Sequence, residues 1–511
     1  MAADPPDQRR CPDEKYGITD AVCRARLQRR FPKCKTCKWN DQSAPRAKPE
    51  AQVNLDDVFK SYDIRGLVDE QLSKPFAWKV GYGVASYLVK TLAPKERAKA
   101  AEQWIVVGHD MRPTSEGYAR AVAEGIRAAG VGAAVIGEVE TPAIYYTVGT
   151  LKALGGVQVT ASHNPIAYNG FKITGPDCVP VGMGSGLEEV KKIFAKLTST
   201  NILATAPLRQ LDISSGYLLH VKKFAGAIRP MKIIVDGSNG MASKWVPSLL
   251  REYNLDAGWL NLDRAGRFKH EPNPLKEENL VELKEHVRAS RAALGVCFDG
   301  DADRVGFVDE NGETVPNDLI TALLVPTFLR KERGATIVYD PRSSWALREE
   351  IEKYEGVPRR ERVGHSHMKA ALRETNAPFG GELSGHSYYR DNFYCDSAVI
   401  TLLLVLAVLS EHPGEKFSDL VRPLRRYYST GEVNFEVEDK KGMIKKIARR
   451  HARAKVDFLD GVTVEYKQWW FNLRPSNTEP LLRLTLEAKT AEMRDERFAA
   501  LVEILGKPSK H

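Results

Sequence analysis

Short runs of apolar residues alternate with amphipathic stretches from about residue 51 onwards. Runs of strand length occur at 105–108, 131–136, 157–160, 231–235, 294–298 and 336–339. Amphipathic stretches of helical length lie between them, at 117–129, 242–253 and 318–331. Because strands that alternate with helices usually form βαβ units, we expect mainly parallel sheets with helices on both faces.

This pattern recurs and then changes near the C-terminus. We expect three α/β domains, at residues 51–207, 208–313 and 314–426. From about residue 427 there are strand-like runs at 432–437 and 481–486 and helix-like stretches at 439–452 and 491–505, which predict a smaller α+β domain at 427–511. The apolar stretch from Ala398 to Leu409 is shorter than the ~20 residues needed to span a bilayer. We therefore expect no membrane association.

Residues 1–50 differ from the rest of the chain. They hold 12 Lys and Arg against 7 Asp and Glu, which is +5 of the formal charge of +9. Because the excess charge is concentrated here, nucleic-acid binding is considered only for this extension. The N-terminus has no apolar signal-like segment, so we expect a cytoplasmic protein.

The same extension carries four of the seven cysteines: Cys11, Cys23, Cys34 and Cys37. Only the last pair has the tight spacing of a zinc knuckle. Two interpretations stay open, a structural Zn²⁺ held by all four thiolates and reduced free thiols in an extended arm.

A candidate nucleophile follows the apolar run that ends near Val159. The sequence there is Thr-Ala-Ser-His-Asn-Pro at 160–165, and Lys172 lies ten residues beyond Ser162. Ligands of open α/β sheets bind at the carboxyl ends of strands. A serine that accepts and donates phosphate needs exposure, a nearby base and cations, and His163 and Lys172 supply the last two. The alternative is a serine that only caps a turn.

Three aspartates alternate directly after another predicted strand, in Asp-Gly-Asp-Ala-Asp-Arg at 299–304. Alternation on an extended loop points Asp299, Asp301 and Asp303 at one spot, as Mg²⁺ requires. No Glu-terminated loop of EF-hand length follows. Because three carboxylates without cations repel one another, a metal site is favoured over a solvated acidic turn.

Further polar loops offer anion-binding and sugar-binding groups. Arg474, Ser476, Asn477 and Thr478 combine a guanidinium, hydroxyls and an amide in one turn, as a phosphate cradle needs. Gly-Gly-Glu-Leu-Ser-Gly-His at 380–386 places hydrogen-bonding side chains between glycines. Each of these loops, read alone, is also compatible with an ordinary turn.

Taken together, these motifs resemble those of the α-D-phosphohexomutase family, closest to its phosphomannomutase/phosphoglucomutase group. The resemblance covers about residues 54–506 and rests on the serine loop, the triple-Asp loop, Gly-Glu-Leu-Ser-Gly-His and Arg-Pro-Ser-Asn-Thr-Glu-Pro, in the family's order. It implies four domains around one cleft, three similar α/β domains and a smaller fourth one. It also implies interconversion of hexose 6-phosphate and hexose 1-phosphate through a phosphoserine and a hexose 1,6-bisphosphate.

The resemblance also implies roles for individual residues. Ser162 would be the phosphoserine and would bind Mg²⁺ with the three aspartates, while glucose 1,6-bisphosphate would be the activator. Arg65 and Lys172 would flank the transferring group, with Lys172 and His365 as candidate acid/base groups. The residues expected to bind substrate are Arg304, Arg342, Glu382, Ser384, His386, Arg474, Ser476, Asn477 and Thr478.

Two departures from the family pattern bear on the substrate. Glutamine at the position of Leu383 marks phosphoglucosamine mutases, so Leu383 argues against an amino sugar. Arg342 lies where bacterial relatives usually have a lysine. The alternatives are a phosphoglucosamine mutase, a glucose-only phosphoglucomutase and a non-catalytic paralogue. We expect hexose phosphates as partners, and a monomer or dimer.

Overall fold

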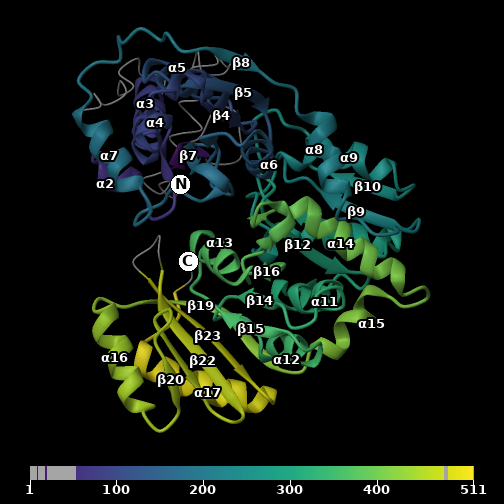
Figure 1. The fold of residues 1–511 in the computed structure, drawn as a ribbon. Coiled ribbons are helices and arrows are strands. Elements are labelled where there is room, and N and C mark those ends of the chain that lie inside the picture. The colour runs from purple at the N-terminus through teal and green to yellow at the C-terminus, as the bar shows by residue number, and fades with distance from the viewer. Residues whose placement is uncertain (1–7, 10–17, 20–52, 477–480, 510–511) are drawn as a thin grey trace.

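The computed structural model describes residues 8–9, 18–19, 53–476 and 481–509, and these residues form four large sheets and one two-stranded ribbon. Figure 1 shows the four sheets as separate layers with their own helices, the first at the upper left and the fourth, in yellow, below. The ribbon pairs β1 (Gln8–Arg9) with β2 (Ile18–Thr19). The expected zinc ligands Cys11, Cys23, Cys34 and Cys37 lie outside the described residues.

The first domain is built on a six-stranded sheet in the order β3-β7-β6-β4-β5-β8. Its strands are β3 (Ile64–Leu67), β4 (Trp104–His109), β5 (Gly132–Glu138), β6 (Gly155–Val159), β7 (Tyr168–Thr174) and β8 (Leu208–Gln210). Its helices are α2 (Leu55–Val58), α3 (Lys74–Thr91), α4 (Pro94–Arg97), α5 (Ser115–Ala128), α6 (Thr141–Leu151) and α7 (Leu187–Lys196). β6 is buried along its whole length, so its sequence shows an apolar run and not an alternation.

The second and third domains repeat one arrangement, three parallel strands followed by two antiparallel ones. The second contains β9 (Lys232–Asp236), β10 (Asp256–Leu260), β11 (Leu294–Phe298), β12 (Val305–Asp309) and β13 (Thr314–Val315), with α8 (Ser214–Lys222), α9 (Ala242–Arg251) and α10 (Val281–Ser290). The third contains β14 (Thr336–Tyr339), β15 (Val357–Arg360), β16 (Phe379–Gly381), β17 (Ser387–Tyr389) and β18 (Cys395–Asp396), with α11 (Asn317–Leu329), α12 (Trp345–Lys353), α13 (His365–Thr375), α14 (Ala398–Glu411) and α15 (Phe417–Val421). The sheets are therefore mixed, whereas the alternation of runs had predicted mainly parallel ones.

The fourth domain has a different fold, an antiparallel sheet in the order β19-β23-β22-β21-β20. It contains β19 (Tyr428–Glu436), β20 (Lys455–Asp457), β21 (Val462–Glu465), β22 (Trp469–Pro475) and β23 (Leu481–Ala488), with α16 (Lys440–Arg450) and α17 (Ala491–Leu505). Both helices agree closely with the stretches predicted from sequence. In the described part of the chain, 3₁₀ segments also occur at Ala100–Glu102, Pro176–Cys178, Glu277–Leu280 and Arg390–Asn392, and another at Arg422–Leu424 leads into this domain.

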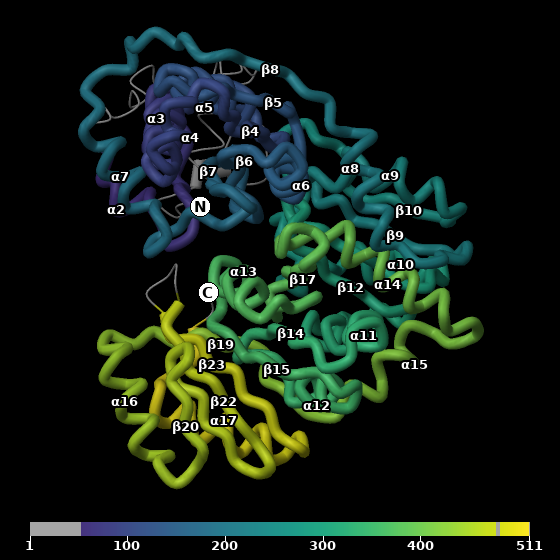
Figure 2. Tube along the Cα trace, viewed as in Figure 1, coloured from purple at the N-terminus to yellow at the C-terminus, as the bar shows by residue number. Residues whose placement is uncertain are grey.

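One hydrophobic cluster is shared by the first three domains, while most of the first domain has a cluster of its own and so does the fourth domain. One cluster joins α6 of the first domain to the second and third domains through residues such as Tyr145, Phe298 and Leu404. The core of the fourth domain, around Phe471 and Leu484, forms its own cluster. The tube trace in Figure 2 shows the fourth domain projecting from the end of the third. The first three domains are thus joined by one shared apolar cluster, whereas the core of the fourth is separate.

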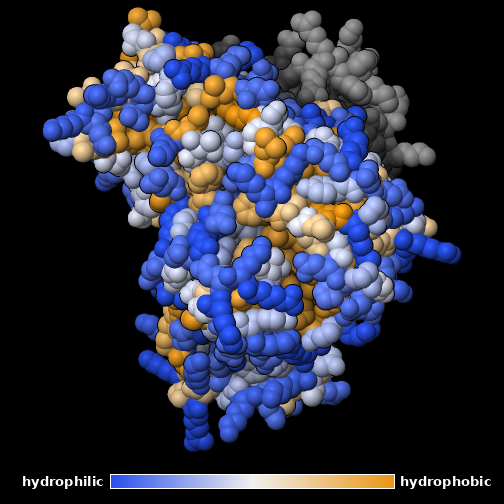
Figure 3. All heavy atoms as spheres, turned by 45° about the vertical axis from the view of Figure 1, so that its right-hand side comes forward, coloured by the Kyte–Doolittle hydropathy of each residue, from blue (hydrophilic) through white to orange (hydrophobic). Residues whose placement is uncertain are grey.

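Helix α14 is the apolar stretch found in the sequence, and every residue from Ala398 to Leu409 is buried. It is apolar on all sides because it packs between elements of the second and third domains. Within the described part of the chain, no helix is both long and apolar enough to cross a membrane. Hydrophilic residues cover most of the face drawn in Figure 3, with apolar ones scattered between them.

Candidate active site

Ser162 lies in a tight loop just beyond the carboxyl end of β6, as the sequence predicted. Its backbone is left-handed, with φ at 50°, and its N–H donates to the Thr160 hydroxyl over 2.9 Å. Its side chain is only 2% exposed, so the expected exposure is wrong. The loop that carries the aspartates covers it. A Cβ at Gly300 would lie 2.5 Å from the Ser162 carbonyl oxygen, so this close approach requires glycine.

Arg112 holds the serine loop in shape, and the sequence analysis did not find it. Its guanidinium is buried and donates to the backbone carbonyls of Ser162 (2.9 Å), Asn164 (2.6 Å), Pro165 (2.8 Å) and Tyr168 (2.9 Å). Asp110 accepts from its Nε over 3.0 Å. The loop is therefore fixed by one side chain that satisfies four carbonyls at once.

The three aspartates converge as predicted, and all are buried. One carboxylate oxygen from each of Asp299, Asp301 and Asp303 lies within 4.8 Å of the others. Oδ1 of Asp301 and Oδ1 of Asp303 are buried without a hydrogen-bond partner. Burial, and then the charges of the other two carboxylates, raise the pKa of Asp299 well above its usual value. Buried acceptors left without donors fit a hard divalent cation.

Two groups of the first domain reach this cluster. The Ser162 hydroxyl donates to Asp299 Oδ2 over 3.1 Å, and Lys172 Nζ lies 2.7 Å from Asp301 Oδ2 and also pairs with Asp303. Burial alone would lower the pKa of Lys172, but the carboxylates beside it reverse that effect and raise it. The lysine is therefore an ammonium group at neutral pH.

His163 and Arg65 lie beside the serine. Nδ1 of His163 is 3.3 Å from the Ser162 hydroxyl, and burial, with the charges of Arg304 and Arg65, lowers the pKa of His163. Arg65 is positioned by β3 and donates to Asn164 Oδ1 over 2.7 Å, and it pairs with Asp63. The serine thus has a neutral imidazole and a guanidinium close by.

The third domain contributes a group of polar side chains that contacts the first and second domains. Glu382 accepts from the Gly364 N–H over 2.9 Å, next to His365 at the start of α13, and Ser384 is partly buried in the following turn. His386 Nε2 accepts from Arg304 Nε over 2.9 Å, which links the third domain to the aspartate loop. Burial, and then the charge of Lys369, lower the pKa of His365.

Tyr62, just before β3, extends this contact to the first domain. Its hydroxyl donates to the Val363 carbonyl over 3.2 Å, and its ring lies 5.3 Å from the ring of His365. Burial raises the pKa of Tyr62 to about 12, helped by Glu382 and Asp460 and opposed by Arg474. These neighbours place the tyrosine where the first, third and fourth domains meet.

The predicted phosphate loop begins at the end of β22. Arg474 and Ser476 are buried there, whereas Asn477 and Thr478 lie outside the described residues. Glu432, which the sequence analysis did not select, bridges Arg474 and Arg342 over 3.2 Å each and accepts from Arg483 over 2.9 Å. Burial alone would raise the pKa of Glu432, but these three guanidiniums lower it to about 2.

Arg342 is therefore brought into the candidate site, at the junction of the third and fourth domains. It also pairs with Asp340 over 2.7 Å, and Asp340 accepts from the Leu383 N–H over 2.9 Å. The arginines can attract a doubly charged phosphate because they outnumber the carboxylates that hold them. The structure thus joins the polar loops of all four domains into one site.

Comparison with known proteins agrees with this architecture. Four family models match the chain in order: the alpha/beta/alpha domains I, II and III of phosphoglucomutase/phosphomannomutase at residues 56–201, 215–312 and 316–427, and the C-terminal domain at 432–504. The chain therefore belongs to the phosphoglucomutase/phosphomannomutase family of hexose phosphate mutases.

Individual relatives cover nearly the same range. A phosphomannomutase of Vibrio cholerae is 34% identical over 442 residues, which is 84% of this chain and 94% of the relative. A phosphomannomutase of Methanocaldococcus jannaschii is 35% identical over 456 residues, 88% and 98% of the two chains. The crystal structure of a phosphoglucomutase/phosphomannomutase family protein from Burkholderia thailandensis superposes with a TM-score of 0.79 at 29% identity, covering 89% of this chain and 99% of that one.

Proposed function

We propose that this chain interconverts hexose 6-phosphate and hexose 1-phosphate of mannose, glucose or both, with Ser162 as the phosphoryl carrier. The observation that carries the proposal is the Ser162 hydroxyl 3.1 Å from Asp299, beside buried carboxylate oxygens that lack partners. A phosphoryl carrier needs this combination of a held oxygen nucleophile and charge neutralisation.

Asp299, Asp301 and Asp303 would hold Mg²⁺ together with phosphorylated Ser162. Bound there, Mg²⁺ would offset the charge that the transferring phosphoryl group carries. Lys172 and Arg65 would supply further positive charge on the side of the first domain. Arg304 would support the phosphoserine from the second domain.

The reaction would proceed in two phosphoryl transfers. The bond between phosphorus and Ser162 Oγ breaks as the free sugar hydroxyl bonds to phosphorus, and the hydroxyl proton passes to a base. The resulting hexose 1,6-bisphosphate turns around, and its other phosphate returns to Ser162. Lys172 and His365 would be the acid/base groups that move this proton. His163, whose Nδ1 lies 3.3 Å from the Ser162 hydroxyl, would be a further catalytic residue at the serine oxygen.

The substrate would be held at its other end by the third and fourth domains. Glu382, Ser384 and His386 would bind sugar hydroxyls. Arg342, Arg474, Ser476, Asn477 and Thr478 would bind the phosphate that does not react. Glu432 keeps two of these guanidiniums together, so a phosphate would meet a preformed pair of donors.

The fourth domain would move to let the intermediate turn around. Its core is separate, and its contacts with the third domain are largely ion pairs, such as Arg360 with Asp457 (2.6 Å) and with Glu465 (2.8 Å). Polar interfaces of this kind open at lower cost than apolar ones. We propose residue 427 as the start of this domain. The starts expected from sequence at 208 and 314 fall too early, because β8 (Leu208–Gln210) pairs within the first sheet and β13 (Thr314–Val315) within the second, so the second and third domains would start after these strands.

The test is a comparison of kcat/KM on mannose 1-phosphate and glucose 1-phosphate, with Mg²⁺ and a trace of glucose 1,6-bisphosphate as activator. Turnover of both, lost in Ser162→Ala and kept in the exposed control Ser199→Ala, is expected for a dual-specificity mutase. Turnover of one sugar alone assigns that sugar. Turnover only of glucosamine phosphate, or no turnover at all, contradicts the proposal.

A further inference from the structure

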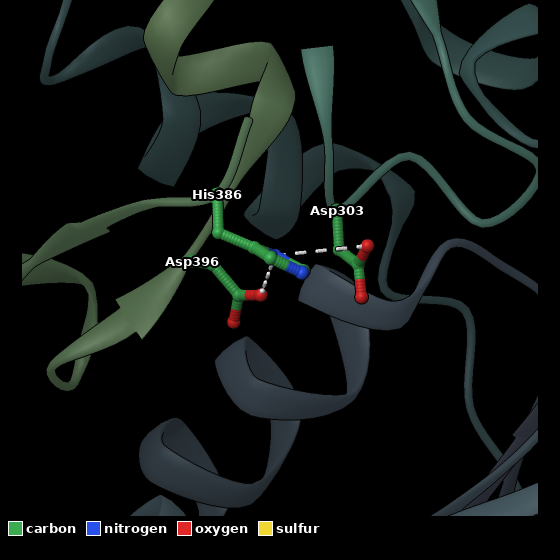
Figure 4. Close-up of side chains that lie close together, drawn as sticks. All are labelled: Asp303, His386 and Asp396. Atoms are coloured by element: carbon green, nitrogen blue, oxygen red, sulfur yellow. Dashed lines mark ion pairs between the residues drawn. The ribbon is translucent and has the colours of Figure 1, made fainter. Parts of the chain in front are cut away.

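A second group of buried ionisable side chains lies behind the aspartate loop, and Figure 4 shows its centre, the His386 ring between Asp303 and Asp396. Nδ1 of His386 is 2.8 Å from Asp396 Oδ2 and 3.8 Å from Asp303 Oδ1. All three side chains are nearly inaccessible, with relative exposures of 7% for His386, 2% for Asp303 and 1% for Asp396. These ligand types could hold a metal ion. Two neighbouring cations point instead to a chain of ion pairs that ends in a hydrogen bond.

The first cation is Arg304. Its Nε donates to His386 Nε2 over 2.9 Å. A guanidinium N–H only donates, so His386 Nε2 must offer its lone pair. The single proton of the neutral imidazole is then on Nδ1, the nitrogen that faces Asp396. That contact is within hydrogen-bonding distance, although the ring is not aligned for a linear hydrogen bond.

The second cation is Lys369, on α13. Its side chain is 0% exposed, and Nζ lies 2.7 Å from Asp396 Oδ1 and 4.0 Å from the ring centroid of Tyr145, on α6 of the first domain. Each oxygen of Asp396 therefore faces a different donor, Lys369 on one side and His386 on the other. The chain Lys369–Asp396–His386–Arg304 connects the third domain to the second at the back of the site, and the Tyr145 ring adds a contact with the first.

We propose that Asp396 is a positioning residue for phosphoryl transfer, because it holds His386 in the Nδ1–H form that aims Arg304 at the phosphoserine loop. This inference rests on the proposed function of Ser162. Arg304 follows Asp303 directly, and its charge is felt at His163, next to the serine. An imidazole with the proton on the other nitrogen would turn an N–H toward the Arg304 N–H and displace the guanidinium.

An Asp396→Asn substitution keeps the size of the side chain. It therefore distinguishes this positioning role from a role in packing alone. An amide has one oxygen, but two donors compete for it. Lys369 is charged and takes the oxygen, so the amide NH₂ faces His386 Nδ1 and forces the proton to Nε2. Replacing Lys369 by methionine removes the competing donor, and the amide oxygen at position 396 can then accept from Nδ1–H. The double variant should therefore recover what Asp396→Asn loses.

The experiment compares four full-length proteins: wild type, Asp396→Asn, Lys369→Met and the double variant. The first readout is the tautomer of His386, from two-bond ¹⁵N–¹H correlations in protein labelled at histidine, with the signal assigned by His386→Gln. The second is kcat and KM for the mutase reaction. Circular dichroism and thermal unfolding check that each variant is folded.

We expect Nδ1–H in wild type, Lys369→Met and the double variant, and Nε2–H in Asp396→Asn. We expect kcat to fall by about 10- to 100-fold in Asp396→Asn, with KM within about threefold, and to recover at least tenfold in the double variant. Unchanged Nδ1–H in folded Asp396→Asn, or no recovery in a folded double variant, would overturn the inference. Because the tautomer is read without turnover, a protein with the expected tautomers but no mutase activity would refute the proposed function instead.

Discussion

The Ser162 hydroxyl donates a hydrogen bond to Asp299 across 3.1 Å, although 137 residues separate them in the sequence. The contact joins the first domain to the second, and it forms only because Gly300 lets the two loops touch. Because this hydrogen bond links the Ser162 nucleophile to the cation site, binding of the metal should affect both groups.

We predict that Mg²⁺ stabilises the protein through the three aspartates. Saturation at about 100 times Kd should add about 2.7 kcal/mol to the free energy of unfolding and raise Tm. Asp301→Asn should weaken Mg²⁺ binding by more than about tenfold, since it removes a buried charged oxygen. Thermal unfolding across a Mg²⁺ titration measures both, with the exposed Asp263→Asn as control. A wild-type Tm that does not respond to Mg²⁺ would contradict this assignment.

Arg112 should be required for the shape of the serine loop. Lysine at this position keeps the charge beside Asp110 but cannot reach four carbonyls, and each buried carbonyl left without a donor costs about 1–3 kcal/mol. We expect Arg112→Lys to lower Tm and to lower kcat by about 10- to 100-fold with little change in KM. Arg120→Lys, on an exposed part of α5, is the matched control. Wild-type kcat in Arg112→Lys would show that the loop needs no such anchor.

Arg474 and Arg483 share Glu432 but should differ in function. Arg474 is 3% exposed and begins the predicted phosphate loop, whereas Arg483 is more exposed. Loss of a charge-assisted hydrogen bond costs about 1.5–3 kcal/mol, so Arg474→Met should raise KM by about 10- to 100-fold. Arg483→Met should change KM by less than about threefold. Equal effects on KM would mean that charge near Glu432, and not direct contact, governs phosphate binding.

Glu487 should make the stability depend on pH. Burial raises its pKa from 4.5 to about 7, although Trp470 Nε1 (2.9 Å) and the Trp345 N–H (3.0 Å) donate to it. The folded state then binds a proton that the unfolded state has released, so the contribution is fully present below pH 4.5 and is lost as pH rises through 7. The free energy of unfolding should fall by about 3 kcal/mol over that window, relative to Glu487→Gln.

Urea unfolding of both proteins at several pH values between 4.5 and 8 measures this difference. The Gln variant keeps an acceptor for both donors but does not titrate. Parallel pH dependences in the two proteins would mean that Glu487 stays ionised in the fold.

The sequence was most informative where burial is complete. The runs at 294–298 and 336–339 predicted β11 and β14 to the residue, because a strand buried on both faces leaves an uninterrupted apolar run. The antiparallel strands that follow them were missed. β13 and β18 have two residues each, too few for any periodicity.

The candidate site was predictable where several functional groups follow each other in sequence. Asp299, Asp301 and Asp303 lie in one loop, so their convergence needed no knowledge of the fold. Arg112 and Glu432 act through partners far away in the sequence, and neither has a local pattern that distinguishes it from a surface charge. The same holds for Asp396, whose partner Lys369 lies 27 positions earlier.

The most direct test of the central claim is the phosphorylation state of Ser162. The protein is treated with a phosphatase, incubated with glucose 1,6-bisphosphate and Mg²⁺, and digested, and the peptides are examined by mass spectrometry. We expect one phosphate on Ser162, which is lost again on incubation with excess hexose 6-phosphate. A phosphate on another residue, or none on Ser162 in an enzyme that turns over, would contradict it.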